Sequence, residues 1–134
     1  MPYQIKQTVD FASLVGMTLT RIGKIEDDED GDALIFYADT GRVFFMYHES
    51  DCCETVYIES ITGNLGDLIG SPITMAEESS NSDDPPLEKD WDDDSHTWTF
   101  YKLATIKGYV DIRWYGTSNG YYSEDVDFVE LEVE

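Results

Sequence analysis

Apolar and polar residues alternate along much of the chain, in short runs rich in β-branched and aromatic side chains. Runs of period two that are bounded by Gly, Asp and Asn are typical of half-buried strands. The pattern predicts strands over 17–25, 33–37, 42–48, 55–61, 97–105, 107–115 and 121–133, with a short edge strand over 73–77. The segment 38–41, Ala-Asp-Thr-Gly, predicts a hairpin turn, because glycine tolerates a positive φ. We expect a mostly β (α+β) protein with antiparallel sheets, as a sandwich or a partly open barrel.

Two short helices are predicted between the strands. Asp10 is a candidate N-cap for a helix over 11–15, and Gly16 is well placed to end it. Residues 65–69 predict the second helix, which Gly70 closes. The strand over 42–48 carries large apolar side chains on both faces, so we expect both faces to be covered.

The order of these elements also predicts an internal repeat, in which residues 64–134 repeat residues 10–63. Each half contains a helix that ends in Gly, followed by a strand, an acidic loop and an aromatic hairpin. A pseudo-twofold would then relate the loops after the two hairpins, 48–54 and 116–123. This alignment matches three alternating residues of each half, Val43, Phe45 and Tyr47 with Val110, Ile112 and Trp114.

The charge of the chain is extreme, with 29 acidic against 8 basic residues and a formal net charge of -21. Direct binding of nucleic acid or of an anionic membrane is disfavoured, because both depend on Lys and Arg. Attraction should run toward basic protein surfaces, including those that normally hold nucleic acid. The predicted acidic surface comprises Glu26, Asp27, Asp28, Glu29, Asp30, Asp32, Asp92, Asp93 and Asp94, together with Glu124, Asp125, Asp127, Glu130, Glu132 and Glu134.

The length of 134 residues and the hydrophobic content of 41% suit one domain, 1–134, with a core of its own. Within it, the Ser-, Asn-, Asp- and Pro-rich segment 79–95 predicts a mobile acidic loop. The chain shows neither a leader-like apolar segment nor a run of about 20 apolar residues, so we expect a soluble protein. Adjacent cysteines, Cys52 and Cys53, do not suit an ordinary disulfide across the fold, which favours a reducing cytoplasm.

One candidate ligand site follows the first hairpin and comprises His48, Asp51, Cys52, Cys53 and Glu54. These residue types could hold zinc, but a structural zinc site usually has spaced pairs of ligands, and adjacent cysteines on an extended chain point in opposite directions. A cysteine nucleophile would also need a base that no accompanying motif supplies. We therefore expect no metal, no cofactor and no catalysis here, and burial of one cysteine is the simpler interpretation.

The second candidate site follows the last hairpin and includes Thr117, Ser118, Asn119 and Tyr121. Small residues over 116–120 could bring backbone amides close to a ligand, as glycine loops do for phosphate. The segment precedes no predicted helix, so a tight turn explains it equally well. Its neighbouring tyrosines suit a recognition surface.

Two boxes carry a resemblance to a known family: Tyr-His-Glu-Ser-Asp-Cys-Cys-Glu at 47–54 and Arg-Trp-Tyr-Gly-Thr-Ser-Asn-Gly-Tyr-Tyr-Ser at 113–123. With the stretch 98–108 between them, the chain resembles a family of uncharacterised phage and prophage proteins from about Leu14 onward. The resemblance implies a phage-encoded protein in a bacterial cytoplasm. It carries over no activity and no site residue.

These observations favour a binding protein over an enzyme. The leading hypothesis is a phage protein that binds a basic protein and inhibits a nucleic-acid-handling defence enzyme of the host by presenting carboxylates in place of phosphates. The first alternative is a small-ligand binding module with a nucleotide-like ligand in a pocket between the two boxes. The second is a structural or assembly accessory protein whose acidity keeps it in solution. The oligomeric state stays open.

Overall fold

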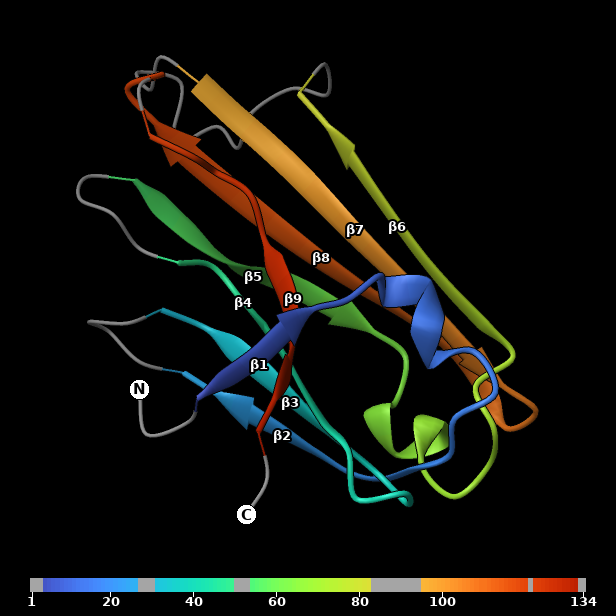
Figure 1. Cartoon of the computed structure of the whole chain (residues 1–134). Coiled ribbons are helices and arrows are strands. Elements are labelled where there is room, and N and C mark those ends of the chain that lie inside the picture. Colours follow the sequence, from blue (N-terminus) through green and yellow to red (C-terminus); the bar gives the residue numbers. More distant parts are fainter. Residues whose placement is uncertain (1–3, 27–30, 50–53, 83–94, 121, 133–134) are drawn as a thin grey trace.

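The computed structural model describes residues 4–26, 31–49, 54–82, 95–120 and 122–132, and it shows two β-sheets that pack face to face (Figure 1). In spatial order, the first sheet contains β1 (Ile5–Thr8), β9 (Asp127–Leu131), β4 (Val43–Tyr47), β3 (Ala33–Ala38) and β2 (Leu19–Ile25). The second contains β5 (Thr55–Thr62), β8 (Gly108–Ser118), β7 (Ser95–Thr105) and β6 (Met75–Asn81). Every pairing is antiparallel, so the predicted mostly β sandwich is confirmed.

The main core lies between the inner faces of the two sheets. Trp114 at the centre of β8 is fully buried, and its indole Nε1 donates a hydrogen bond to Sδ of Met46 on β4 at 3.3 Å. Phe44 and Phe128 of the first sheet stack with their ring centroids 5.8 Å apart. Because each fully buried side chain of this size stabilises the fold by roughly 1.5–3 kcal/mol, this layer accounts for the sandwich without a long helix.

The outer face of the first sheet is also covered. Phe45 and Tyr47 of β4 lie there with Val129 and Leu131 of β9, and all four side chains are buried. Phe44 and Met46 face the main core from the same strand. The prediction that both faces of this strand are covered is therefore confirmed.

Tight turns appear where glycines were expected to form them. Gly41 has a φ of +91°, and its N–H donates to the carbonyl of Ala38 at 3.0 Å, which closes the β3–β4 hairpin. Gly16 and Gly70 also have positive φ and follow the two short helices. These three turns need a backbone conformation that side chains with a Cβ disfavour.

The helices are shorter and tighter than the sequence predicted. Both are 3-10 helices of four residues, η1 (Phe11–Leu14) and η2 (Leu65–Leu68). Asp10 occupies the N-cap position of η1, as predicted, but its side chain makes no capping bond. Asn64 caps η2 instead, because its Oδ1 accepts the Gly66 N–H at 2.8 Å. A single turn between strands has no room for an α-helical repeat.

Three strand boundaries also differ from the prediction. Residues 79–81 belong to β6 and Ser95 begins β7, so part of the segment predicted as a mobile loop is paired strand, while residues 83–94 lie outside the described part of the chain. The last strand occupies only Asp127–Leu131 instead of 121–133. Strand β1 was not expected, because four residues are too few to show a clear alternation of apolar and polar positions. Pairing with strands that are distant in the sequence determines where these strands begin and end.

In the predicted repeat, the last strand of each half pairs into the sheet formed by the strands of the other half. Strands β2, β3 and β4 continue into β9 from the second half, whereas β6, β7 and β8 continue into β5 from the first. At the centre, the Gly16 N–H donates to the Ile73 carbonyl at 2.8 Å, and the Gly70 N–H donates to the Leu19 carbonyl at 2.9 Å. Gly16 aligns with Gly70 and Leu19 with Ile73, so these contacts are reciprocal, as a twofold axis requires. The repeat itself stays a prediction that superposition of the halves would test.

The residue alignment proposed for that repeat does not preserve the faces of the strands. Val43, Phe45 and Tyr47 lie on the outer face of the first sheet, whereas Val110, Ile112 and Trp114 lie in the main core. An alignment that preserves the faces must shift by one residue, because neighbouring strand residues point to opposite sides.

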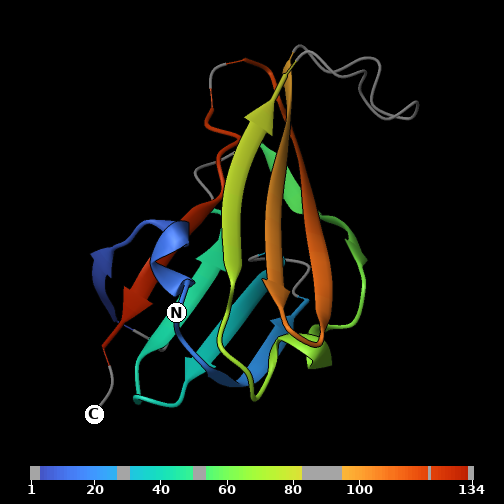
Figure 2. The ribbon, with the colours of Figure 1, turned by 90° about the vertical axis from the view of Figure 1, so that its right-hand side faces the viewer.

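The sandwich is open at one end. Figure 2 shows the upper halves of β6 and β7 projecting beyond the strands of the first sheet, with the chain that leads into β9 alongside. Along β6, the inner face changes there from buried Ala76 to Glu78 and Ser80. The apolar core therefore ends before the strand does.

Candidate functional site

A groove of about 340 Å³ lies at this open end, between the inner face of β6–β7 and the segment that enters β9. Its lining residues come from three distant parts of the sequence: Glu78, Ser79, Ser80, Thr99, Asp125, Val126 and Asp127. Strand pairing explains how they meet. Glu78 lies opposite Tyr101, and Ser80 lies opposite Thr99, so these side chains share the inner face.

The groove is strongly acidic. It has carboxylates from Glu78, Asp125 and Asp127, and no basic residue lines it in the part of the chain that the structure describes. Burial raises the pKa of Asp127. The backbone N–H of Glu49, which donates to Oδ2 of Asp127 at 3.3 Å, and the neighbouring His48 lower this pKa, whereas the charges of Asp125 and Glu49 raise it. Like charges held together in this way are relieved by a cation.

Tyr101 lies beside these carboxylates, fully buried on the inner face of β7. Its hydroxyl is 3.5 Å from the carbonyl oxygen of Val126. Burial and the neighbouring Glu78 carboxylate raise the pKa of Tyr101 far above its usual range, and Asp127 and Asp125 add to the effect. The phenol therefore stays a neutral hydrogen-bond donor and adds no negative charge to the groove.

Thr99 is the buried hydroxyl of the groove, with 5% of the residue exposed. Its side chain makes no hydrogen bond to any residue of the described segments. A hydroxyl in this position can bind a ligand that enters the groove.

The structure brings His48 and Glu54 of the first predicted ligand site together in the interior. His48 Nδ1 donates to the carbonyl oxygen of Asp125 at 2.6 Å, and its Nε2 lies 3.4 Å from Oε1 of Glu54. The side chains are only 6% and 0% exposed. This contact ties the end of β4 to the segments before β5 and β9. Asp51, Cys52 and Cys53 lie outside the described residues.

Two of the four residues of the second predicted site lie in a strand rather than in a loop. Thr117 and Ser118 are buried residues of β8, and Thr117 pairs with Thr55, so the two boxes are neighbours. The Ser118 hydroxyl donates to Glu124 Oε2 at 2.5 Å and accepts the Gly120 N–H at 3.0 Å. Thr97 donates to the other oxygen of Glu124 at 2.8 Å.

The remaining two members of this site are Asn119 and Tyr121. Asn119 lies in the turn after β8 and is exposed, whereas Tyr121 lies outside the described part of the chain. None of the described members of either box lines the groove. A pocket between the boxes therefore stays a prediction. Sequence reasoning missed the groove because it assigned residues 79–95 to a loop, although Glu78 and Ser80 already alternate as strand residues do.

The acidic residues predicted to form one surface have different environments. Glu26 is exposed and pairs with Lys24 at 2.8 Å, and this contact lowers the pKa of Glu26. Asp32 is half-buried, and its Oδ2 accepts the Ile58 N–H at 2.8 Å. The assignment of Glu124 and Glu130 to the surface was wrong, because both are buried. The other predicted surface acids at 27–30, 92–94 and 134 lie outside the described residues.

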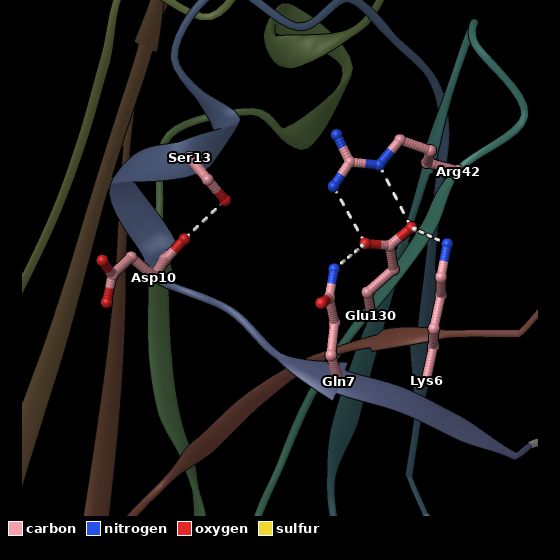
Figure 3. A network of polar contacts seen from close by, with 6 residues as sticks. All are labelled: Lys6, Gln7, Asp10, Ser13, Arg42 and Glu130. Atoms are coloured by element: carbon pink, nitrogen blue, oxygen red, sulfur yellow. Dashed lines mark hydrogen bonds and ion pairs between the residues drawn. The ribbon is translucent and has the colours of Figure 1, made fainter.

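Glu130 forms a buried ion-pair network that joins β1 and β9 to Arg42, the residue before β4 (Figure 3). Arg42 donates from Nε to Oε2 at 3.1 Å and from Nη2 to Oε1 at 2.9 Å, and Gln7 donates to Oε1 at 3.0 Å. Lys6 adds an ion pair at 3.8 Å. Because Arg42 hydrogen-bonds the carboxylate, the pKa of Glu130 falls to about 2. The network has a structural role, since its donors occupy both oxygens.

Within the described segments, no helix is long and apolar enough to cross a membrane. Comparison with known proteins gave no match among curated proteins or solved structures. One family is matched by its sequence model over residues 12–128, a span that takes in the groove, both hairpins and both boxes. The chain therefore belongs to the family described as Domain of unknown function (DUF7448).

Proposed function

We propose that this protein acts by binding a basic surface of another protein and not by catalysis. The observation that carries the proposal is a groove with three carboxylates and no described basic residue, in a folded chain of net charge -21. A field of this sign attracts basic surfaces over about 10 Å at moderate salt and speeds encounter with them.

The protein's own cations leave this field largely intact. Lys6, Lys24, Arg42 and Arg113 each pair with a carboxylate of the same chain. The groove carboxylates Glu78, Asp125 and Asp127 take part in none of these pairs. No cation of the described residues neutralises them, although Glu78 interacts with the Tyr101 hydroxyl and Asp127 accepts the Glu49 N–H.

We also propose what kind of protein the partner is. The resemblance to phage and prophage proteins favours a phage-encoded protein in a bacterial cytoplasm, with a nucleic-acid-handling defence enzyme of the host as its target. In such an enzyme, a basic nucleic-acid site would accept carboxylates in place of phosphates. The groove is lined by carboxylates and hydroxyls, which are also the acceptor types that a basic site meets on a nucleic-acid backbone.

The test is affinity capture from bacterial lysate with the tagged full chain, at low and at high salt, followed by mass spectrometry and competition with duplex DNA. We expect a basic nucleic-acid-binding protein that high salt releases and DNA displaces. Capture that is indifferent to salt would contradict the electrostatic proposal. Capture that DNA does not displace would contradict the nucleic-acid-mimic proposal alone.

A further inference from the structure

We propose that the groove between β6–β7 and the entry of β9 is a receptor for one guanidinium group, supplied by an arginine side chain of the partner protein. This inference rests on the proposed function and adds to it the place of contact and the chemistry that is recognised. The hydrogen-bonding groups that line the groove support this proposal.

The groove offers acceptors on opposite sides. Glu78 and Ser80 contribute from β6, while Asp125 and Asp127 contribute from the segment that enters β9. Thr99 of β7 lies beside Ser80 of β6, its cross-strand partner, and also lines the groove. A planar guanidinium has five N–H donors in a fixed fork and can bond several separate acceptors at once.

Other cations fit this arrangement less well. A metal ion needs ligands that converge on one point, and no group of three or more His, Cys, Asp or Glu side chains in the described residues is close enough to provide them. A lysine ammonium is a compact point charge with three donors, so it cannot span separated carboxylates equally well. The separation of the acceptors therefore favours arginine.

The size of the groove and the weak hydration of guanidinium both favour an arginine side chain. The groove volume of about 340 Å³ is at the lower end of the range of roughly 300–1,000 Å³ for ligand pockets. A single long side chain that enters from a partner suits this space better than a large free ligand. Guanidinium is also less strongly hydrated than ammonium, so it loses less on entering a partly closed groove.

Thr99 supports the proposal independently of the acidic residues. Thr99 lines the groove with 5% of the residue exposed, and its side chain forms no hydrogen bond within the described residues. A neutral hydroxyl contributes nothing to a diffuse electrostatic field. Its position is explained if it accepts an N–H bond from a guanidinium that the carboxylates hold.

The experiment is a titration of the full-length ¹⁵N-labelled chain, followed by NMR at low salt, with three probes. These are N-acetyl-arginine amide, N-acetyl-lysine amide and N-acetyl-citrulline amide, of which citrulline has nearly the shape of arginine without its charge. We expect the arginine probe to shift the amides of Ser80, Thr99 and Val126, with at least about tenfold tighter binding than the citrulline probe. The lysine probe should bind more weakly than the arginine probe.

Two matched double variants distinguish binding in the groove from attraction by the overall negative charge. Glu78→Gln with Asp127→Asn should weaken arginine binding by about tenfold or more, whereas Glu77→Gln with Glu132→Gln should change it less than about twofold. Glu77 and Glu132 are exposed and do not line the groove. Thr99→Val should weaken binding severalfold while the chain remains as stable as before, because it removes an unpaired hydroxyl.

Several results would overturn the inference. These are equal binding of citrulline and arginine, equal loss in the two double variants, or arginine-induced shifts that appear outside the groove. If the chain captures a basic protein but the arginine probe does not enter the groove, this inference fails and the proposed function stands. If the probe binds in the groove but no basic protein is captured, the proposed function fails and only the recognition of guanidinium by the groove stands.

Discussion

Glu130→Gln removes one charge from the buried network of β1, β9 and Arg42 without changing the size of the side chain. The Glu130 side chain is 4% exposed, and Arg42 bonds both of its oxygens. Glutamine keeps one acceptor oxygen but turns an NH₂ group toward the Arg42 donors. We expect this variant to be less stable at neutral pH.

The magnitude follows from the pKa of Glu130, which is lowered from 4.5 to about 2. Such a difference between folded and unfolded chains corresponds to roughly 3 kcal/mol at neutral pH. Solvent screening reduces this figure, since the Arg42 and Lys6 side chains are 41% and 55% exposed. We therefore expect the free energy of unfolding to fall by about 2 kcal/mol in the variant.

The pH dependence has a definite sign. A carboxyl group whose folded pKa is lowered stabilises the fold above its unfolded pKa, and this stability is lost as the pH falls through its folded pKa. The stability difference between native chain and Glu130→Gln should be complete near pH 7. It should decline from about pH 4.5 toward the pKa of Glu130, which is about 2. Subtracting the variant's curve of unfolding free energy against pH from that of the native chain cancels the titration of the other acids.

The assay is urea unfolding followed by tryptophan fluorescence, because Trp114 is fully buried and reports on the core. The control is Glu26→Gln, which breaks an exposed ion pair with Lys24 and should leave stability unchanged. A stability difference that stays constant down to pH 2 would refute the electrostatic argument and assign the loss to packing. No loss at pH 7 would refute the importance of the network.

Two further predictions test local geometry by the same unfolding assay. Gly63→Ala should destabilise the protein by more than about 2 kcal/mol, because φ is +100° and the added Cβ would collide with the Tyr109 carbonyl. Gly41→Ala, with φ +91° and open space around it, should cost only about 1 kcal/mol, and equal losses would contradict this reasoning. Ser118→Ala should cost about 1–3 kcal/mol, because it leaves Glu124 Oε2 and the Gly120 N–H without their partner, and an unchanged urea midpoint would show that this contact is dispensable.

The sequence by itself determined the class of fold, most of the strands and the net charge. Alternation of side chains is a local property, so the β3–β4 hairpin and both covered faces of β4 could be predicted from it. The glycine turns could be predicted for the same reason, since a positive φ depends on the residue itself. The 3-10 form of η1 and η2 and the strand at Ile5–Thr8 could not, because they depend on what packs beside them.

Only the tertiary structure decided the role of each acid. Glu130 and Glu124 resemble their exposed neighbours in sequence, but one meets Arg42 and the other meets Thr97 and Ser118. The groove likewise joins residues near 78, 99 and 125, which lie far apart in the sequence. Chain pairing over such distances sets which charges are buried, paired or left open to a partner, because these depend on neighbours in space and not on the residue type.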